Sequence, residues 1–213
     1  MAYKRSLLTG GGEAHTNQSN TTKKEITMIG YAFCGSFCTL SASIGALREL
    51  IAAGESVQPI FSETVSSTDT RFWKAKELRQ SVTEICGREP IDTIVAAEPL
   101  GPAKPLEAMI IAPCTGNTLA KLACGITDSS VTMAAKAHLR SSRPLIVALA
   151  SNDAMSANLS NIATLLSRKA VYFVPLRQDD PSGKPHSLVA DFTLVRRALE
   201  AAREGKQLRP LFI

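Results

Sequence analysis

The sequence predicts a doubly wound, parallel α/β sheet with helices on both faces, and two patterns support this prediction. The expected strands are continuous apolar runs without polar alternation, which is typical of strands buried on both faces. Stretches with apolar residues at helical spacing separate these runs, as crossovers between parallel strands require. A chain of 213 residues, of which 45% are hydrophobic, can bury a substantial core and needs no disulfide or metal to hold it together.

The first half of the chain alternates between apolar runs and stretches with helical periodicity. The expected elements are, in order, a strand at 26–33, a helix that starts at residue 40 and ends at Gly54, a strand at 57–61, a polar loop at 62–70, a helix at 72–86, a short helix at 91–97 and a proline-rich turn at 99–105. Gly54 and Gly87 follow the two longer helices, where glycine is typical of a helix end.

The same alternation continues in the second half. The expected elements are, in order, a strand at 108–112 that ends at Pro113, a helix at 117–124 that ends at Gly125, a helix at 129–139, a strand at 144–150, a helix at 155–166, a strand at 171–174 closed by Pro175, and a C-terminal helix at 188–203. Asp128 directly precedes the helix at 129–139, so we expect its carboxylate to be the N-cap of that helix.

The composition changes near residue 24, which predicts a boundary. Residues 1–23 include a segment rich in Gly, Asn and Thr with almost nothing to bury, and we expect them to form a flexible N-terminal extension. Residues 24–213 are expected to form a single α/β domain.

The net charge of +5 resides at the two ends of the chain. Residues 28–191 hold 15 basic and 15 acidic side chains, so the body is neutral and lacks the basic cluster that would indicate nucleic-acid binding. No apolar run reaches the roughly 20 residues of a membrane-spanning helix, and the start of the chain carries no apolar secretory segment. Five cysteines are an odd number and do not indicate a disulfide framework, so we expect a reducing cytoplasm.

Ligands of open α/β sheets bind beyond the carboxyl ends of the strands, so the residues at these ends are the candidate binding residues. They are Gly35 and Ser36 after the first strand, Ser62 and Thr64 after the second, Thr115, Gly116 and Asn117 after the middle strand, and Ser151 and Asn152 after the next. Glycine lets the backbone approach a ligand, and a helix N-terminus attracts anions. The first turn lacks the glycine pattern of a dinucleotide site, but it is compatible with a mononucleotide phosphate.

These strand ends resemble the motifs of a flavoprotein family that includes peptidyl-cysteine decarboxylases and phosphopantothenoylcysteine decarboxylase. The Gly35-Ser36 turn is similar to that family's first turn, and the segment 113–118 is similar to its Pro-Ala-Ser-Ala-Asn-Thr-type segment. The segment 151–155 stands at the place of the family's Pro-Ala-Met-Asn segment. The resemblance implies a Rossmann-like flavoprotein fold, bound FMN and a homo-oligomer.

The same resemblance implies a role for each candidate residue in FMN binding. Gly35 and Ser36 would contact the phosphate, helped by Ser62 or Thr64. The implied positions nearer the ring are Thr115, Gly116 and Asn117 along the isoalloxazine or ribityl region, with Ser151 and Asn152 close to the ring itself.

Within this family, the chain from about residue 25 to residue 213 is most similar to the dipicolinate synthase B chains. The similar stretches are 67–72, 97–102, 112–117, 127–129, 133–137, 143–144, 151–154 and 174–181. The resemblance implies that the chain acts with an A chain, which carries NADP, to oxidise a dihydrodipicolinate-type precursor to dipicolinic acid during sporulation. It also implies a cytoplasmic location in the mother cell of a spore-forming bacterium.

A substrate with two carboxylates requires cationic side chains, and the planar guanidinium of arginine can bind a carboxylate through two hydrogen bonds. Arg71, which follows the loop rich in Ser and Thr, is the first candidate for this role. Lys121 is the second candidate, and Lys136 and Arg177 are further options.

Several residues keep other functions open. The three histidines, His15, His138 and His186, do not stand where the cysteine decarboxylases of this family carry a catalytic histidine. No catalytic residue is assigned, because the residues alone do not choose among the possible general bases Asp128, Asp153 and Asp179. Two alternatives therefore remain: a non-catalytic subunit that shapes the substrate pocket without flavin, and an FMN-dependent decarboxylase of the cysteine type.

A metal site is disfavoured by the spacing of the cysteines. Cys34 and Cys38 are four residues apart, with neither a nearby histidine nor a second cysteine pair. We expect them, like Cys114 beside the middle strand, to be small packed residues.

Overall fold

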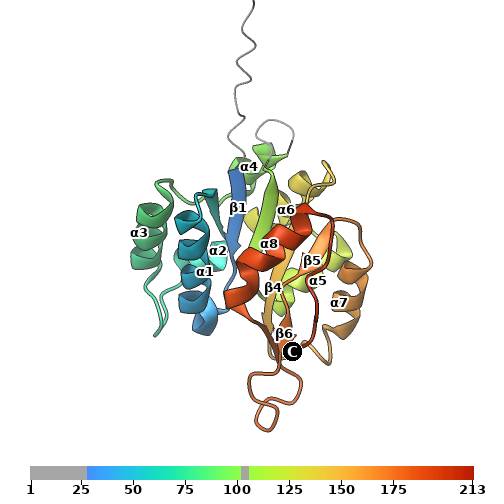
Figure 1. Ribbon diagram of the computed structural model, residues 1–213. Coiled ribbons are helices and arrows are strands. Elements are labelled where there is room, and N and C mark those ends of the chain that lie inside the picture. The colour runs from blue at the N-terminus through green and yellow to red at the C-terminus, as the bar shows by residue number, and fades with distance from the viewer. Residues whose placement is uncertain (1–27, 102–105) are drawn as a thin grey trace, which may run out of the picture.

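The computed structural model describes residues 28–101 and 106–213, with a seven-stranded sheet at the centre (Figure 1). The strands are β1 (Met28–Phe33), β2 (Ser56–Phe61), β3 (Ala108–Cys114), β4 (Leu145–Ser151), β5 (Val171–Phe173), β6 (Leu176–Arg177) and β7 (Leu188–Ala190). Their order is β2-β1-β3-β4-β7-β6, and β5 also pairs with β4. The predicted α/β fold is confirmed.

The sheet is parallel from β1 to β5, whereas β7 and β6 are antiparallel additions. β4 divides its outer edge between two partners: residues 145–147 pair with β5, and residues 150–151 pair with β7. β6 then pairs with β7. The described sheet is therefore mostly parallel, and it differs at these last two strands from the fully parallel sheet that the sequence predicts.

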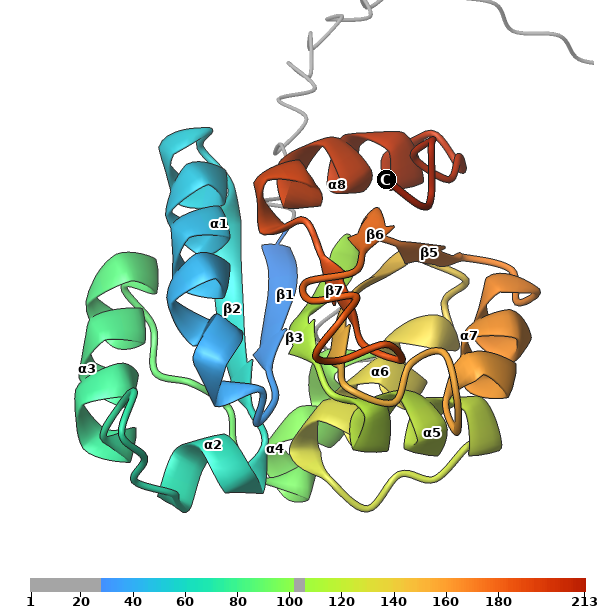
Figure 2. The same ribbon diagram turned by 90° about the horizontal axis from the view of Figure 1, so that it is seen from below.

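Helices cover both faces of the sheet (Figure 2). They are α1 (Leu40–Ala52), α2 (Glu63–Ser67), α3 (Ala75–Cys86), α4 (Ile94–Ala97), α5 (Gly116–Cys124), α6 (Ser130–Leu139), α7 (Leu159–Leu166) and α8 (Val195–Arg203), with 3-10 turns at Phe37–Thr39, Glu98–Leu100 and Phe192–Leu194. α1 and α8 pack together on one face, and α5 and α6 pack together on the other. Among the described residues, no helix is both long enough and apolar enough to cross a bilayer.

Burial on both faces explains why the strands carry no polar alternation. Every residue of β3 is buried, and so are the residues of β1 after Met28. Within this core, the Tyr31 hydroxyl on β1 donates to the Ser43 carbonyl of α1 at 2.8 Å. The Ser43 hydroxyl in turn donates to the Ala112 carbonyl of β3 at 2.5 Å. These two bonds attach α1 to the centre of the sheet.

A side chain covers the outer edge of β5. The Phe173 N–H donates to Gln207 Oε1 at 2.8 Å, and Gln207 Nε2 donates to the Phe173 carbonyl at 2.6 Å. The carboxamide of Gln207 thus pairs with both backbone groups of Phe173, as a neighbouring strand would.

Short backbone segments cover the other strand edges. At β6, the Leu176 N–H donates to the Leu211 carbonyl at 2.8 Å, and the Ile213 N–H donates to the Leu176 carbonyl at 2.9 Å. At β2, the Ile91 N–H donates to the Pro59 carbonyl at 3.0 Å. Residue 91 therefore forms a bridge to β2, and the helix expected at 91–97 is limited to α4.

Two of the predicted elements are wrong, for identifiable local reasons. Part of the loop expected at 62–70 is the helix α2, because the Ser62 side chain accepts the Val65 N–H and Val65 is buried. The C-terminal helix expected from residue 188 begins at Val195, because residues 188–190 form β7 instead. The periodicity of the sequence did not distinguish a three-residue strand from the start of a helix.

The prediction that Asp128 is the N-cap of α6 is also wrong. Ser129 holds this position: its side chain accepts the Thr132 N–H, and the Thr132 side chain accepts the Ser129 N–H, which makes a capping box. Asp128 pairs with Lys121 instead. The expected extension at 1–23 and the proline-rich residues 102–105 lie outside the described residues, and the single domain at 24–213 stays a prediction.

An ion-pair network joins three segments at the amino ends of the strands. Arg203, at the end of α8, donates to Glu55 at 2.7 and 2.9 Å and to Glu107 at 2.8 and 3.0 Å. Glu55 directly precedes β2, and Glu107 directly precedes β3. Because the three side chains are only 20–30% exposed, the pairs are less screened by solvent than ordinary surface pairs.

We expect Arg203→Ala to lower the free energy of unfolding by about 1–2 kcal/mol, because it removes two partly shielded ion pairs and leaves two carboxylates unpaired. Urea denaturation at low and high salt measures the effect, which should decrease with salt. Arg196→Ala is the control, since its pair with Glu200 is half exposed at 3.7 Å and should contribute at most about 0.5 kcal/mol. Equal losses in the two variants would contradict the prediction.

Candidate functional site

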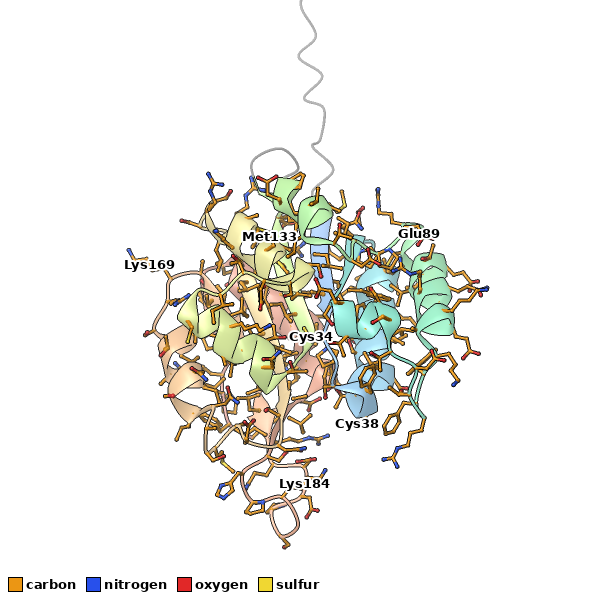
Figure 3. All side chains as sticks on the ribbon, turned by 180° about the vertical axis from the view of Figure 1, so that it is seen from behind. Cys34, Cys38, Glu89, Met133, Lys169 and Lys184 are labelled. Atoms are coloured by element: carbon orange, nitrogen blue, oxygen red, sulfur yellow. The ribbon has the colours of Figure 1, made fainter. Side chains whose placement is uncertain are left out.

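A cavity of about 250 Å³ lies at the carboxyl edge of the sheet. The chain leaves β1 toward β2 on one side, and it later returns as β3 on the other side. Such a reversal opens a crevice where open α/β sheets bind their ligands. The cavity is lined by Cys34, Gly35, Ser62, Glu63, Thr64, Thr115, Asn117, Thr118, Lys121 and Ser129. In Figure 3, Cys34 lies between the ribbons of α2 and α5.

The structure brings six of the sequence-predicted site residues to this cavity. They come from the turns after β1, β2 and β3 and from the helices α2 and α5: Gly35, Ser62, Thr64, Thr115, Asn117 and Lys121. Gly35 allows the turn after β1 to approach α2 closely, because a Cβ at this position would lie 3.2 Å from Thr64 Cγ2. These six positions thus lie around one cavity, while their roles in binding stay predictions.

Hydroxyl groups at the cavity already have partners within the chain. Thr115 is the N-cap of α5: its Oγ1 accepts the Thr118 N–H at 3.2 Å and donates to Thr118 Oγ1 at 3.1 Å. Thr118 Oγ1 then donates to Cys34 Sγ at 3.4 Å. Ser62 and Ser129 are the N-caps of α2 and α6. These side chains therefore orient the starts of the helices, whose N–H groups face the carboxyl edge.

The charged groups of the cavity are also bound within the chain. Glu63 Oε1 accepts the Ser130 N–H at 3.0 Å, so a carboxylate of this chain occupies the N-terminus of α6. Lys121 Nζ contacts both carboxylate oxygens of Asp128 at 2.9 Å. Lys121 is 27% exposed and Asp128 is 55% exposed, so the pair lies at the mouth of the cavity. Sequence reasoning missed Glu63 and Ser129, although each lies directly beside a residue that it had considered.

A second polar cluster, formed by side chains at and after the end of β4, surrounds Gly116 at the start of α5. The Ser151 hydroxyl donates to Asp153, and Asn158 Nδ2 donates to the other oxygen of that carboxylate at 2.9 Å. A Cβ at Gly116 would collide with Ser151 and lie 2.7 Å from Asn158 Nδ2. The start of α5 can thus approach β4 only because residue 116 is glycine.

The hydrogen bond from Ser151 is the main cause that lowers the pKa of Asp153, and the bond from Asn158 adds to it. Asp153 was a possible general base, but a lowered pKa makes it a weaker base and a more stable carboxylate. Asn152, next to it, is exposed and contacts Ser187 at 3.5 Å.

Ser36 and Arg71 belong neither to the cavity lining nor to the cluster around Gly116. The Ser36 hydroxyl accepts a bond from Thr39 at 3.0 Å within the turn after β1. Arg71 is exposed, and its guanidinium lies over its neighbour Phe72, 4.8 Å from the ring centroid. The turn that carries Arg71 is ordered by the Thr70 hydroxyl, which accepts the N–H groups of Phe72 and Trp73 at 3.2 Å.

The buried thiols of Cys34 and Cys114 and the buried imidazole of His138 are poorly suited to react. Burial raises the pKa of Cys34 to about 11 and that of Cys114 well above its ordinary value, so neither is a thiolate at neutral pH. Burial also lowers the pKa of His138, whose Nε2 contacts the Pro144 carbonyl at 2.9 Å. Across residues 28–101 and 106–213, no three His, Cys, Asp or Glu side chains are grouped as metal ligands would be.

The comparisons with known proteins agree with this geometry. Residues 16–193 match the family model described as Flavoprotein. The chain is 43% identical over 185 residues to the B subunit of dipicolinate synthase from Bacillus subtilis, and the match covers 87% of this chain and 92% of that one. The chain belongs to the Flavoprotein family.

The similarity of the chain to solved structures differs among the members of that family. Its fold is similar to the crystal structure of the dipicolinate synthase B subunit from Bacillus halodurans, with a TM-score of 0.81 and 40% identity over 88% of this chain and 96% of that one. The fold of an FMN-dependent cysteine decarboxylase is more distant, with a TM-score of 0.62 and 20% identity over 83% of this chain and 97% of that one. Within its family, the protein thus resembles the B subunit of dipicolinate synthase.

We expect Ser151→Ala to raise the pKa of Asp153 toward the ordinary value of an aspartate, because it removes the main hydrogen bond to the ionised form. A lowered folded-state pKa stabilises the fold above the unfolded-state pKa, and this stabilisation is lost as the pH falls through the folded-state pKa. The variant should therefore be less stable than the parent at neutral pH and equally stable in strong acid. Carboxyl NMR titration and urea denaturation across this range measure both effects; an unchanged Asp153 titration would contradict the assignment.

Proposed function

We propose that the chain acts as the B chain of a dipicolinate synthase, which oxidises a dihydrodipicolinate-type precursor to dipicolinic acid together with an A chain. The observation that carries this proposal is the 43% identity to the Bacillus subtilis relative over 92% of that protein. That relative is by its name one subunit of a synthase, which supports a second chain as partner. The proposal includes NADP on the A chain, a homo-oligomer of the B chain, and action in the mother cell during sporulation.

The polar groups at the carboxyl edge fit the phosphate end of FMN. Gly35, the hydroxyl groups of Ser62 and Thr64, and Asn117 near the start of α5 line one cavity, and such groups beside a helix N-terminus attract a phosphate. The cavity of about 250 Å³ is smaller than the about 300–1,000 Å³ typical of whole-ligand pockets. The cavity would therefore hold the phosphate end of FMN rather than the whole cofactor.

In this binding mode, Gly35 would contact the phosphate, helped by Ser62 or Thr64, with Ser36 beside it in the same turn but outside the cavity lining. Asn117 would hydrogen-bond the ligand beside Thr115 and Gly116. Ser151 and Asn152, at the end of β4, lie on the side proposed for the ring. When bound, a flavin supplies a two-electron acceptor for the oxidation. As the N-cap of α5, Thr115 positions the backbone N–H groups at the start of that helix.

Two cations are proposed to bind the carboxylates of the substrate. Lys121 lines the cavity, and Asp128 holds its ammonium group at the mouth. Arg71 is presented on an ordered turn and has no carboxylate within ion-pairing distance among the described residues. The two cations differ in exposure, so their contributions can be separated.

A second candidate function is a non-catalytic subunit that shapes the substrate pocket without flavin. The observation that favours it is that the ionisable groups lining the cavity are already occupied: Cys34 is protonated, Glu63 binds the Ser130 N–H, and Lys121 is paired. A decarboxylase of the cysteine type is a weaker alternative, because no histidine of the described residues lines the cavity.

We expect the purified protein to bind FMN, and Asn117→Ala to weaken this binding by about fivefold to tenfold, which corresponds to one lost hydrogen bond of about 1–1.5 kcal/mol. Flavin absorbance and fluorescence titration provide the measurement. Gln80→Ala on α3, an exposed amide far from the cavity lining, is the matched control and should bind FMN as the parent does. Protein that stays colourless and ignores added FMN would refute the flavin proposal and support the non-catalytic subunit.

We expect Lys121→Gln to weaken dipicolinate binding by about 1–2 kcal/mol, because a partly buried charged hydrogen bond is lost. Arg71→Gln should cost only about 0–1 kcal/mol in the isolated B chain, because an exposed pair is screened by solvent. Calorimetric titration of both variants gives the comparison. An effect of Lys121→Gln on FMN alone would mean that this lysine does not bind the substrate.

A further inference from the structure

A second cavity, of about 400 Å³, lies between α5, the loop after it, α6 and the end of α7. We call it the α5–α6 groove. It is lined by Leu122, Gly125, Ile126, Thr127, Thr132, Lys136, Leu139, Arg140 and Arg168. No residue is shared with the lining of the carboxyl-edge cavity, so the two cavities are separate sites on the same helices.

The floor of the groove is apolar and open. Ile126 is 46% exposed although it is a large hydrophobic side chain. Gly125 has a φ of +73°, and no atom lies within 4 Å of the position that a Cβ would take there. Leu122 and Leu139 complete the apolar surface. A ligand with a flat apolar body can thus cover side chains that are otherwise exposed to water.

Among the residues that the structure describes, the lining of the groove includes three cations and no carboxylate. Arg168 is fixed in place, because its Nη1 and Nη2 donate to the Leu122 and Ala123 carbonyls at 3.1 and 2.7 Å. Together with the Gly125 N–H, which donates to the Leu122 carbonyl at 3.2 Å, these bonds already satisfy the C-terminal end of α5. Lys136 and Arg140 are therefore not needed to bind the carbonyl groups at that end of α5.

Lys136 and Arg140 form a like-charged pair at positions i and i+4 of α6 and its C-cap. Among the described residues, neither has a carboxylate within ion-pairing distance. The dipole of α6 favours cations in its last turn, but two like charges on one helical face repel each other. A bound anion would relieve this repulsion.

We infer that the α5–α6 groove binds a small aromatic carboxylate. The carboxylate lies between Lys136 and Arg140, with Arg168 as the third, pre-oriented donor, and the ring lies on Ile126 and Leu122. The groove size is within the range of small-molecule pockets. The inference stands on the groove itself and does not depend on flavin binding or on the dipicolinate reaction.

The test uses benzoate as the probe and isothermal titration calorimetry on the full chain. We expect saturable binding that is about tenfold or more weaker in the double variant Lys136→Gln/Arg140→Gln, because both charged donors are lost. Ile126→Ser should also weaken binding of benzoate, whereas acetate, which lacks the ring, should bind more weakly to the parent and respond little to this change. Both rim residues are exposed, and circular dichroism verifies that the variants are folded.

Two controls separate this groove from other cationic surfaces. Arg48→Gln/Lys76→Gln removes two exposed cations from α1 and α3 and should leave benzoate affinity unchanged. Lys121→Gln alters the carboxyl-edge cavity and should likewise leave it unchanged. The inference is overturned if benzoate shows no saturable binding, if the rim double variant binds as the parent does, or if Lys121→Gln abolishes binding.

Discussion

The burial of β1 and β3 on both faces is the constraint on which the rest of this structure depends. A strand covered on both faces must satisfy its backbone groups in the sheet ladder and carry apolar side chains, so it offers no place for polar chemistry along its length. Polar side chains that follow these strands in the chain therefore gather where the strands end. Because the chain leaves β1 in one direction and returns as β3 on the other side, the two ends open a crevice between them.

The same hydroxyls that make the carboxyl edge polar are used to start its helices. Thr115, Ser62 and Ser129 each accept an N–H of the helix that follows. Glu63 adds a carboxylate at the start of α6. The start of α6 is thereby occupied by a carboxylate of the chain itself, which leaves the start of α5, near Asn117, as the proposed place for an anion. Because these side chains already bind helix N–H groups, the cavity has many polar residues but few side chains that are free to react.

The sequence allowed the order of the larger elements to be predicted, because strands buried on both faces and amphipathic helices have different periodicities. It also located Thr115 and Asn117, since the strand before them is easily recognised. It failed where a few residues decide the structure: Ser62 starts α2 by a single side-chain bond, and residues 188–190 become a strand because β4 has a free edge there. Arg71 was a candidate because it follows the Ser- and Thr-rich segment, but no local pattern could show that it lies outside the cavity lining.

The pairing of Gln207 with Phe173 has a consequence for association. A strand that still offers N–H and carbonyl groups at its edge can accept a strand from another molecule, which is a common route to aggregation. Here one carboxamide occupies the outer edge of β5, residues 211–213 occupy that of β6, and Ile91 occupies part of that of β2. Within the described residues the sheet is thus closed to further growth at these positions. At these positions a partner protein would meet side chains and loop segments instead of free backbone groups.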